Sequence, residues 1–231
     1  MLHLRGTSQN DMLERVKREA EIYFSCGLDA VLVENYFGSE RDCIMALEYL
    51  QKHFSGKPYG VNILGNIPLS FDIAKYYGAD FLQIDSVCGH LSPVEDRLFG
   101  ERLDRLRQNA DCQVLGGLRF KYQPVLSGRS LEEDTAIAKG RCDAVVTTGE
   151  ATAADCPTEK LYRLKELLGD FPLITGAGVT ASTVAEKLIF SDGVIVGSWL
   201  KNGHRAEGEV NEEYVRQFVN NADRVRFKPH P

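Results

Sequence analysis

Short apolar stretches alternate with amphipathic stretches along the 231 residues of this chain. The apolar stretches have the length of β-strands, whereas the amphipathic stretches repeat with the period of a helix. The predicted strands are Leu2–Leu4, Asp29–Glu34, Pro58–Leu64, Asp80–Asp85, Cys112–Lys121, Asp143–Thr148, Pro172–Thr175 and Gly193–Val196. The predicted helices are Asp11–Cys26, Arg41–His53, Pro68–Tyr77, Glu95–Asn109, Leu131–Lys139, Pro157–Leu168, a stretch after Gly178, and Asn211–Ala222. This alternation is typical of a parallel α/β fold.

The number of strand–helix units selects the type of α/β fold. Eight units follow one another with no linker rich in Pro, Gly or Ser, and the chain length is near the ~250 residues of a typical barrel. Five or six units would instead have suggested an open doubly wound sheet. We therefore predict a single (β/α)₈ TIM barrel over residues 1–226, followed by a C-terminal tail over residues 227–231.

Two glycine-containing turns follow the last two predicted strands. Gly176-Ala177-Gly178 comes after the seventh strand, and Gly197-Ser198 comes after the eighth. In TIM barrels the loops at these two positions often form a phosphate site, because glycine allows close backbone approach and amides at a helix start bind anions. The alternative is that the glycines only form tight turns. We favour the phosphate site and expect a phosphorylated small molecule as the ligand.

Polar residues occur near the C-terminal ends of the predicted strands, which is the active-site end of a TIM barrel. Alternate strand residues point inward, and the candidates on shared faces or strand ends are His3, Glu34 with Asn35, Gly60 with Asn62, Gln83 with Asp85, Arg119 with Lys121, and Thr147 with Thr148. A buried charge needs a partner, so we expect Asp85 or Glu34 to pair with Arg119 or Lys121. The cluster is either a buried ionic plug or an active site, and its position at one end favours the active site.

Glu34, Asp85 and Lys121 are the predicted catalytic residues. The two carboxylates suit a general acid and base; alternatively they bind Mg²⁺ with Asn62 supplying an oxygen, and no other metal or cofactor is predicted. Lys121 either forms a Schiff base, if burial or Arg119 lowers its pKa, or holds a phosphate or carboxylate. The predicted substrate-binding residues are Asn35, Asn62, Asn66, Arg119 and Thr148.

Composition narrows the class of protein further. The net charge of −6 argues against a nucleic-acid partner, and no apolar run of ~18 residues is present that could span a membrane. The first residues lack the apolar core of a signal peptide. Six scattered cysteines without metal-site spacing are expected to be reduced thiols in a cytoplasmic protein. The oligomeric state stays open, a homo-oligomer included.

Several segments together resemble one known family. They are Met1–Leu4, Gly27–Asn35, Gly60–Asn66, Thr147–Thr152, Gly176–Thr180 and Asp192–Lys201. The chain resembles the BtpA/SgcQ family, named after a photosystem I biogenesis protein, over residues 1 to about 226. The resemblance implies a barrel similar to the ribulose-phosphate-binding superfamily but supplies no reaction. The chain departs from the family where Arg5-Gly6-Thr7-Ser8 replaces a Pro-Leu-Pro-Gly opening. Lys121-Tyr122 also replaces Lys-His, so a histidine acid or base is unavailable there.

Our leading hypothesis is a cytoplasmic enzyme that acts on a phosphorylated sugar or nucleotide-like metabolite as an isomerase, aldolase or lyase. The alternative, suggested by the family name, is a non-catalytic assembly or stability factor for a membrane complex such as photosystem I. An assembly factor needs an exposed apolar patch, whereas this chain carries a cluster of polar residues at its strand ends.

Overall fold

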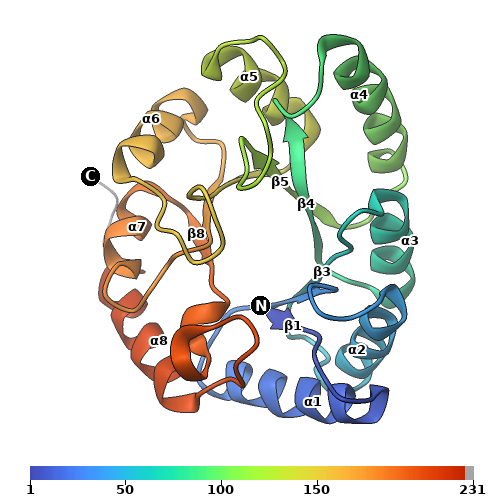
Figure 1. The fold of residues 1–231 in the computed structure, drawn as a ribbon, viewed down its shortest axis with the longest axis vertical. Helices are drawn as coiled ribbons and strands as arrows, with labels where there is room; N and C mark the ends of the chain where they lie inside the picture. The colour runs from blue at the N-terminus through green and yellow to red at the C-terminus, as the bar shows by residue number, and fades with distance from the viewer. Residues whose placement is uncertain (227–231) are drawn as a thin grey trace.

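The computed structural model describes residues 1–226 as a ring of strands surrounded by helices (Figure 1). The parallel strands are β1 Leu2–His3, β2 Val31–Glu34, β3 Tyr59–Asn62, β4 Phe81–Cys88, β5 Gln113–Leu118, β6 Ala144–Thr147, β7 Leu173–Gly176 and β8 Gly193–Ile195, in that spatial order. The helices are α1 Gln9–Ser25, α2 Glu40–His53, α3 Ile67–Tyr77, α4 Pro93–Arg107, α5 Leu131–Arg141, α6 Thr158–Leu168, α7 Val184–Phe190 and α8 Glu212–Arg226. Two short 3₁₀ helices, η1 Ser198–Leu200 and η2 Asn202–His204, follow β8. The predicted TIM barrel is confirmed, and the predicted tail lies outside the described residues.

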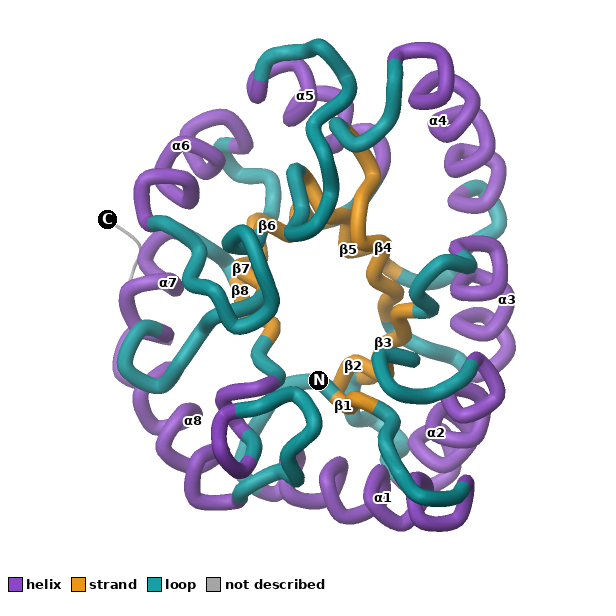
Figure 2. Tube along the Cα trace, in the orientation of Figure 1, coloured by secondary structure: helices purple, strands orange, loops and turns teal. Residues whose placement is uncertain are grey.

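The barrel closes where the start of the chain, before β1, meets the end of β8. Figure 2 shows the start of the chain beside the end of β8. The amino group of Met1 donates a hydrogen bond of 2.9 Å to the carbonyl oxygen of Val196. This contact joins the first residue of the chain to the residue that follows β8. No helix within residues 1–226 is long and apolar enough to cross a membrane.

Local signals in the sequence explain where the helices begin. The Ser8 hydroxyl accepts a hydrogen bond from the amide of Asp11 at the start of α1. Ser39 begins α2 with a capping box, in which serine and the third helical residue satisfy each other's backbone amides. Ser130 begins α5 in the same way. Capping therefore places these helix starts within one or two residues of the predicted ones.

The inside of the barrel is filled by side chains of the strands. Gly60 on β3 faces the ring of Phe81 on β4, and a β-carbon at position 60 would collide with that ring. Gly60 therefore leaves room for the Phe81 ring and forms no polar pair with Asn62.

The layer between the sheet and the helices is apolar. Leucines of β4 and of the helices, including Leu47, Leu82 and Leu161, are fully buried there.

Candidate active site

A cavity of about 220 Å³ opens at the C-terminal ends of the strands. We call it the mouth cavity. It is lined by His3, Glu34 and Gln83, by Lys121 and Thr148, and by residues of both glycine turns. The structure thus brings together predicted site residues from five strand ends: β2, the loops after β5 and β6, and the turns after β7 and β8.

Glu34, at the end of β2, is a buried carboxyl group at the floor of this cavity. Its side chain accepts a hydrogen bond of 3.0 Å from the amide nitrogen of Asn62, and its other oxygen lies 3.7 Å from Nε2 of His3. Burial and then the negative charge of Asp85 raise the pKa of Glu34 to about 7, although Lys121 opposes the shift. A carboxyl group with a pKa near neutrality can both release and accept a proton at physiological pH.

Asp85, on β4, is held by amides and not by the predicted cations. Asn62 and Gln83 donate hydrogen bonds of 2.9 and 3.0 Å to the same oxygen, Oδ1. The amide nitrogen of Asn62 therefore lies between the carboxylates of Glu34 and Asp85. The expectation that Arg119 or Lys121 pairs with Asp85 or Glu34 is replaced by this shared amide, which leaves both carboxyl groups without a neutralising ion pair to either residue.

His3 and Lys201 form a buried pair behind Glu34. Nζ of Lys201 lies 3.0 Å from Nδ1 of His3, and both groups are within 3.1 Å of the carbonyl oxygen of Ala206. An ammonium group can only donate, so a charged Lys201 makes Nδ1 an acceptor and leaves the proton of neutral His3 on Nε2, which faces Glu34. Burial, followed by the charge of Lys201, holds the pKa of His3 well below its ordinary value.

Lys201 is a residue that the sequence reasoning missed. Its side chain is fully buried, and burial lowers its pKa to about 8. Lys201 directly follows the 3₁₀ helix η1. No strand or helix periodicity in this segment could predict that its side chain would be buried. The only available signal was its place at the end of the segment 192–201, which resembles the BtpA/SgcQ family.

Lys121 enters the mouth cavity from the loop after β5. Its amide donates to Oγ1 of Thr148 at 2.8 Å, and its Nζ donates to Oγ1 of Thr152 at 3.2 Å. Tyr122 accepts a hydrogen bond of 2.8 Å from the amide of Thr152. These contacts tie the β5 and β6 loops together and aim the half-buried ammonium group at the cavity.

Arg119 does not share a face with Lys121. Strand β5 ends at Leu118, and Arg119 has a φ of 47°, a left-handed conformation that breaks the alternation of the strand. Its guanidinium donates to Asp134 at the start of α5, at 3.0 Å. Arg119 is not among the residues that line the mouth cavity, so its predicted place on one strand face with Lys121 is wrong, while its role in binding substrate stays a prediction.

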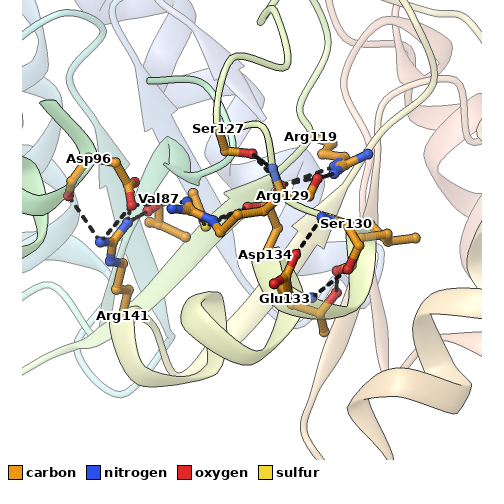
Figure 3. A network of polar contacts seen from close by, with 12 residues as sticks. Val87, Asp96, Arg119, Ser127, Arg129, Ser130, Glu133, Asp134 and Arg141 are labelled. Carbon is orange, nitrogen blue, oxygen red and sulfur yellow. Dashed lines mark hydrogen bonds and ion pairs between the residues drawn. The ribbon is translucent and has the colours of Figure 1, made fainter. Parts of the chain in front are cut away.

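Arg119 belongs to a network that fastens the loop after β5 (Figure 3). Asp134 accepts ion pairs from Arg119 and Arg129, and Asp96 accepts ion pairs from Arg129 and Arg141. We call these five residues the arginine network. Both carboxylates are at most 4% exposed. The network thus pins residues 119–130, which carry Lys121, against the starts of α4 and α5.

Asn35 and Asn66 support the backbone near the mouth. Oδ1 of Asn35 accepts a hydrogen bond of 2.7 Å from the amide of Leu64. Asn66 caps α3 through the amide of Leu69 and donates to Glu40 at 2.8 Å. Neither residue lines the mouth cavity, but Asn66 lines a second cavity that shares Gln83 with it. The predicted role of the two asparagines in binding substrate stays a prediction.

The glycine turns have the backbone shape that the sequence suggested, but the helices begin elsewhere. Ala177 and Gly178 have φ values of 61° and 67°, and a β-carbon at Gly178 would collide with the carbonyl of Ala154. Helix α7 begins only at Val184, so the expected helix start directly after Gly178 is wrong. After Gly197, in contrast, η1 begins at once. Both turns line the mouth cavity.

The sequence offered Glu34, Asp85 and Asn62 as possible ligands of Mg²⁺, and the structure shows how these three side chains are arranged. Within residues 1–226, no group of three or more His, Cys, Asp or Glu side chains is arranged to hold a metal ion. Asn62 presents its amide nitrogen to both carboxylates, whereas a Mg²⁺ ligand would have to present its oxygen. A bound ion would thus require the Asn62 amide to turn over.

Several solved structures share the fold of this chain. The native KDPGal structure is 16% identical with a TM-score of 0.69, and the alignment covers 96% of this chain and 93% of that chain. N-(5'-phosphoribosyl)anthranilate isomerase from Pyrococcus furiosus is 18% identical with a TM-score of 0.59, covering 92% and 93%. Orotidine 5'-phosphate decarboxylase from Pyrococcus horikoshii is 11% identical with a TM-score of 0.61, covering 96% and 97%. At these identities the likeness shows the TIM-barrel fold.

Relatives in sequence cover nearly the whole chain. An uncharacterised protein of Thermococcus kodakarensis is 27% identical over 94% of this chain and 88% of its own length. Photosystem I biogenesis protein BtpA of Synechocystis is 24% identical over 97% of this chain and 84% of its own length. The family model described as the BtpA family matches residues 5–224.

Proposed function

The chain belongs to the BtpA family, and from this premise and the geometry of the mouth cavity we propose that it is an enzyme acting on a phosphorylated sugar or nucleotide-like metabolite. The proposed chemistry is proton transfer of the kind used by isomerases, aldolases and lyases. The observation that carries the proposal is Glu34, a buried carboxyl group with a pKa of about 7, in one cavity with Lys121 and two glycine turns.

The glycine turns are the proposed phosphate end of the cavity. Ala177 and Gly178 both have left-handed φ values, and consecutive turn amides of this sort form concave anion sites. The amides at the start of η1 add to them, because the first amides of a helix lack helical partners. The amine of Lys121 lines the same cavity and supplies positive charge.

Glu34 is the proposed acid or base, with His3 and Asp85 setting its environment. A substrate carbon or hydroxyl group above Glu34 would exchange a proton with its carboxyl group. Lys121 then stabilises the negative charge that develops on a neighbouring oxygen, or forms an imine with a carbonyl substrate. Borohydride reduction with aldehyde and ketone phosphates distinguishes these two roles, because an imine leaves a stable adduct on Lys121.

Phosphate binding provides the direct test. We expect ribose 5-phosphate to bind with a measurable heat in calorimetry, and Ser198→Asp to abolish that heat by placing a carboxylate in the anion site. Ser198 lines the cavity, whereas Ser55 lies exposed in the loop after α2. Ser55→Asp therefore changes the net charge equally and should leave binding intact.

Two results would count against the proposal. If no phosphorylated ligand binds, or if Ser198→Asp binds as well as Ser55→Asp, the glycine turns are structural. The non-catalytic alternative would then be favoured, and a screen for protein partners would replace the screen for substrates. The cytoplasmic location expected from the cysteines stays a prediction.

A further inference from the structure

His204, the last residue of η2, is a histidine of the mouth cavity that the proposed function leaves unused. It lines the cavity together with Ser198 and Trp199, on the side where the chain continues from β8. The residue is exposed, so a ligand in the cavity can reach it. Histidine is also the side chain that most readily changes its charge near neutral pH.

Aromatic contacts hold the imidazole ring of His204 in place. Its centroid lies 5.1 Å from the nearly parallel ring of Trp199 and 4.7 Å from the ring of Tyr214 on α8. Trp199 in turn contacts the buried ring of Phe218 on α8. The exposed histidine is therefore anchored to the core and does not swing freely at the surface.

A single hydrogen bond fixes the tautomer of this ring. Nδ1 of His204 lies 2.8 Å from the carbonyl oxygen of Trp199. A carbonyl oxygen can only accept, so Nδ1 carries a proton in every charge state. Within residues 1–226, Nε2 has no hydrogen-bond or ion-pair partner. Nε2 is thus an acceptor in the neutral ring and becomes a donor only when the ring is charged.

The backbone of His204 carries a conformational cost. Its φ of 53° is left-handed, a region that residues other than glycine rarely adopt. Such outliers occur most often at ligand-binding sites, where the surrounding structure imposes them. Ala177, in the glycine turn on the same cavity, has a left-handed φ of 61°.

We infer that His204 is a further ligand-binding residue of the mouth cavity, whose Nε2 binds an oxygen of the ligand's phosphate group. This inference rests on the proposed function, which supplies the phosphate. A phosphate dianion only accepts hydrogen bonds, so it selects the ring that is protonated on both nitrogens. Binding therefore takes up a proton from the solvent, and this proton stays on Nε2 in the complex.

The charged groups around His204 are already engaged with other partners. Arg205, the next residue, forms an ion pair with Glu207. Lys201 contacts His3 and the carbonyl oxygen of Ala206. On α8, Tyr214 touches the ring, while Glu212 of the first turn pairs with Arg216. The other titratable side chains of the cavity are His3, Glu34 and Lys121. The ligand is thus the counter-charge available to a protonated His204.

Calorimetry with ribose 5-phosphate and an asparagine variant tests this role. Asparagine tolerates a left-handed φ and can still donate to the carbonyl of Trp199, so His204→Asn removes Nε2 and its charge while retaining these features. We expect it to weaken binding about tenfold, the effect of losing one charge-assisted hydrogen bond. His53, an exposed histidine stacked on Tyr49 of α2, lies outside the cavity. His53→Asn should therefore leave the affinity unchanged.

Nitrogen-15 NMR of the wild-type imidazoles supplies a readout that a structural role would not move. At about pH 7.5 a free histidine is mostly neutral. Adding ribose 5-phosphate should shift the Nε2 signal of His204 to the position of a protonated nitrogen, while Nδ1 stays protonated. The spectrum of His204→Asn identifies the signal, because it is missing there.

The outcomes separate this inference from the proposed function. If ribose 5-phosphate binds but Nε2 stays unprotonated, or if His204→Asn binds as tightly as His53→Asn, His204 is not a phosphate ligand and the proposed function stands. If Ser198→Asp has no effect while both His204 results hold, the anion binds at His204 and the glycine turns are not its site. If ribose 5-phosphate does not bind to the wild type, both proposals fail.

Discussion

Two pairs of carboxylates, Asp96 with Asp134 and Glu34 with Asp85, differ in the groups that surround their negative charge. Asp96 and Asp134 are surrounded by three arginines in the arginine network. Burial alone would raise their pKa values, but the arginine hydrogen bonds and charges outweigh it and hold both pKa values below the ordinary one. Their charge is therefore permanent at neutral pH and serves to hold the chain.

Glu34 and Asp85 are instead linked by amide groups. With no arginine beside it, burial and the charge of Asp85 raise the pKa of Glu34 to about 7. The comparison shows that burial by itself does not mark a catalytic carboxyl group. What separates the two pairs is whether a fixed cation accompanies the buried charge.

The largest effect is expected for Asp134→Asn, which leaves Arg119 and Arg129 without their carboxylate. Removing one partner of a buried ion pair costs about 3 kcal/mol or more in the free energy of unfolding, and urea denaturation measures it. Glu132 lies on the same helix as Asp134, and Glu132→Gln breaks its exposed ion pair with Arg163 of α6. This substitution should cost at most about 1 kcal/mol. Equal effects of the two substitutions would show that the network is not structural.

Glu34→Gln is expected to increase the free energy of unfolding, in contrast to Asp134→Asn. The folded-state pKa of Glu34 is raised from 4.5 to about 7, so the folded chain bears a cost that appears as the pH rises from 4.5 through 7. The variant should match the wild type at pH 4 and gain up to about 3 kcal/mol at pH 8, from about 1.4 kcal/mol per pKa unit, while losing turnover.

Urea denaturation at both pH values measures the Glu34→Gln gain, with Glu14→Gln as the exposed control. A loss of stability at pH 8 would contradict the comparison, because it would make Glu34 a structural charge like Asp134. The arginine network should show the reverse dependence of stability on pH. Because the pKa of Asp134 is lowered from 3.8, its contribution is present above that value and is lost as the pH falls through the folded pKa.

A smaller change is expected for Lys201→Met. The substitution should change the free energy of unfolding by about 1 kcal/mol, the size of a typical hydrogen bond. Its main effect should be on His3, whose proton moves from Nε2 to Nδ1 to reach the carbonyl of Ala206. Nitrogen-15 NMR of the imidazole distinguishes the two tautomers, and an unchanged spectrum would show that Lys201 does not orient His3.

The smallest effect on stability is expected for Lys121→Met. Its ammonium group is half-buried and donates to Thr152, so the change should stay within about 0.5 kcal/mol. Turnover should nevertheless be lost, and the pKa of Glu34 should rise further, because Lys121 lowers it. A thermal melt with a pH titration of Glu34 measures both, and a large loss of stability would favour an ionic plug.

Much of the fold follows from local patterns, and part of the site does too. All eight strands were placed, since apolar runs and serine caps act over a few residues. Glu34 and Lys121 were placed in one cavity because their strands end at the same edge. β4, however, extends to Cys88 instead of Asp85, and its end shows a register shift that no local pattern revealed.

The errors have physical causes that lie outside any one segment. Strand parity holds only while the backbone stays extended, and the left-handed conformation of Arg119 ends it. Asparagine side chains are also short enough to bond the nearby backbone, and the structure shows such bonds for Asn35 and Asn66. The sequence spacing of these residues is compatible with either outcome.

By itself the sequence determined the order and type of the elements, the glycine turns, and the polar character of the strand ends, because hydrophobic period, capping and turn chemistry are local properties. Only the tertiary structure decided which buried carboxylates meet arginines and which meet amides, and it alone placed Lys201 behind His3. The reason is that desolvation and charge pairing depend on groups far apart in the chain, here 198 residues for His3 and Lys201, which no local pattern encodes.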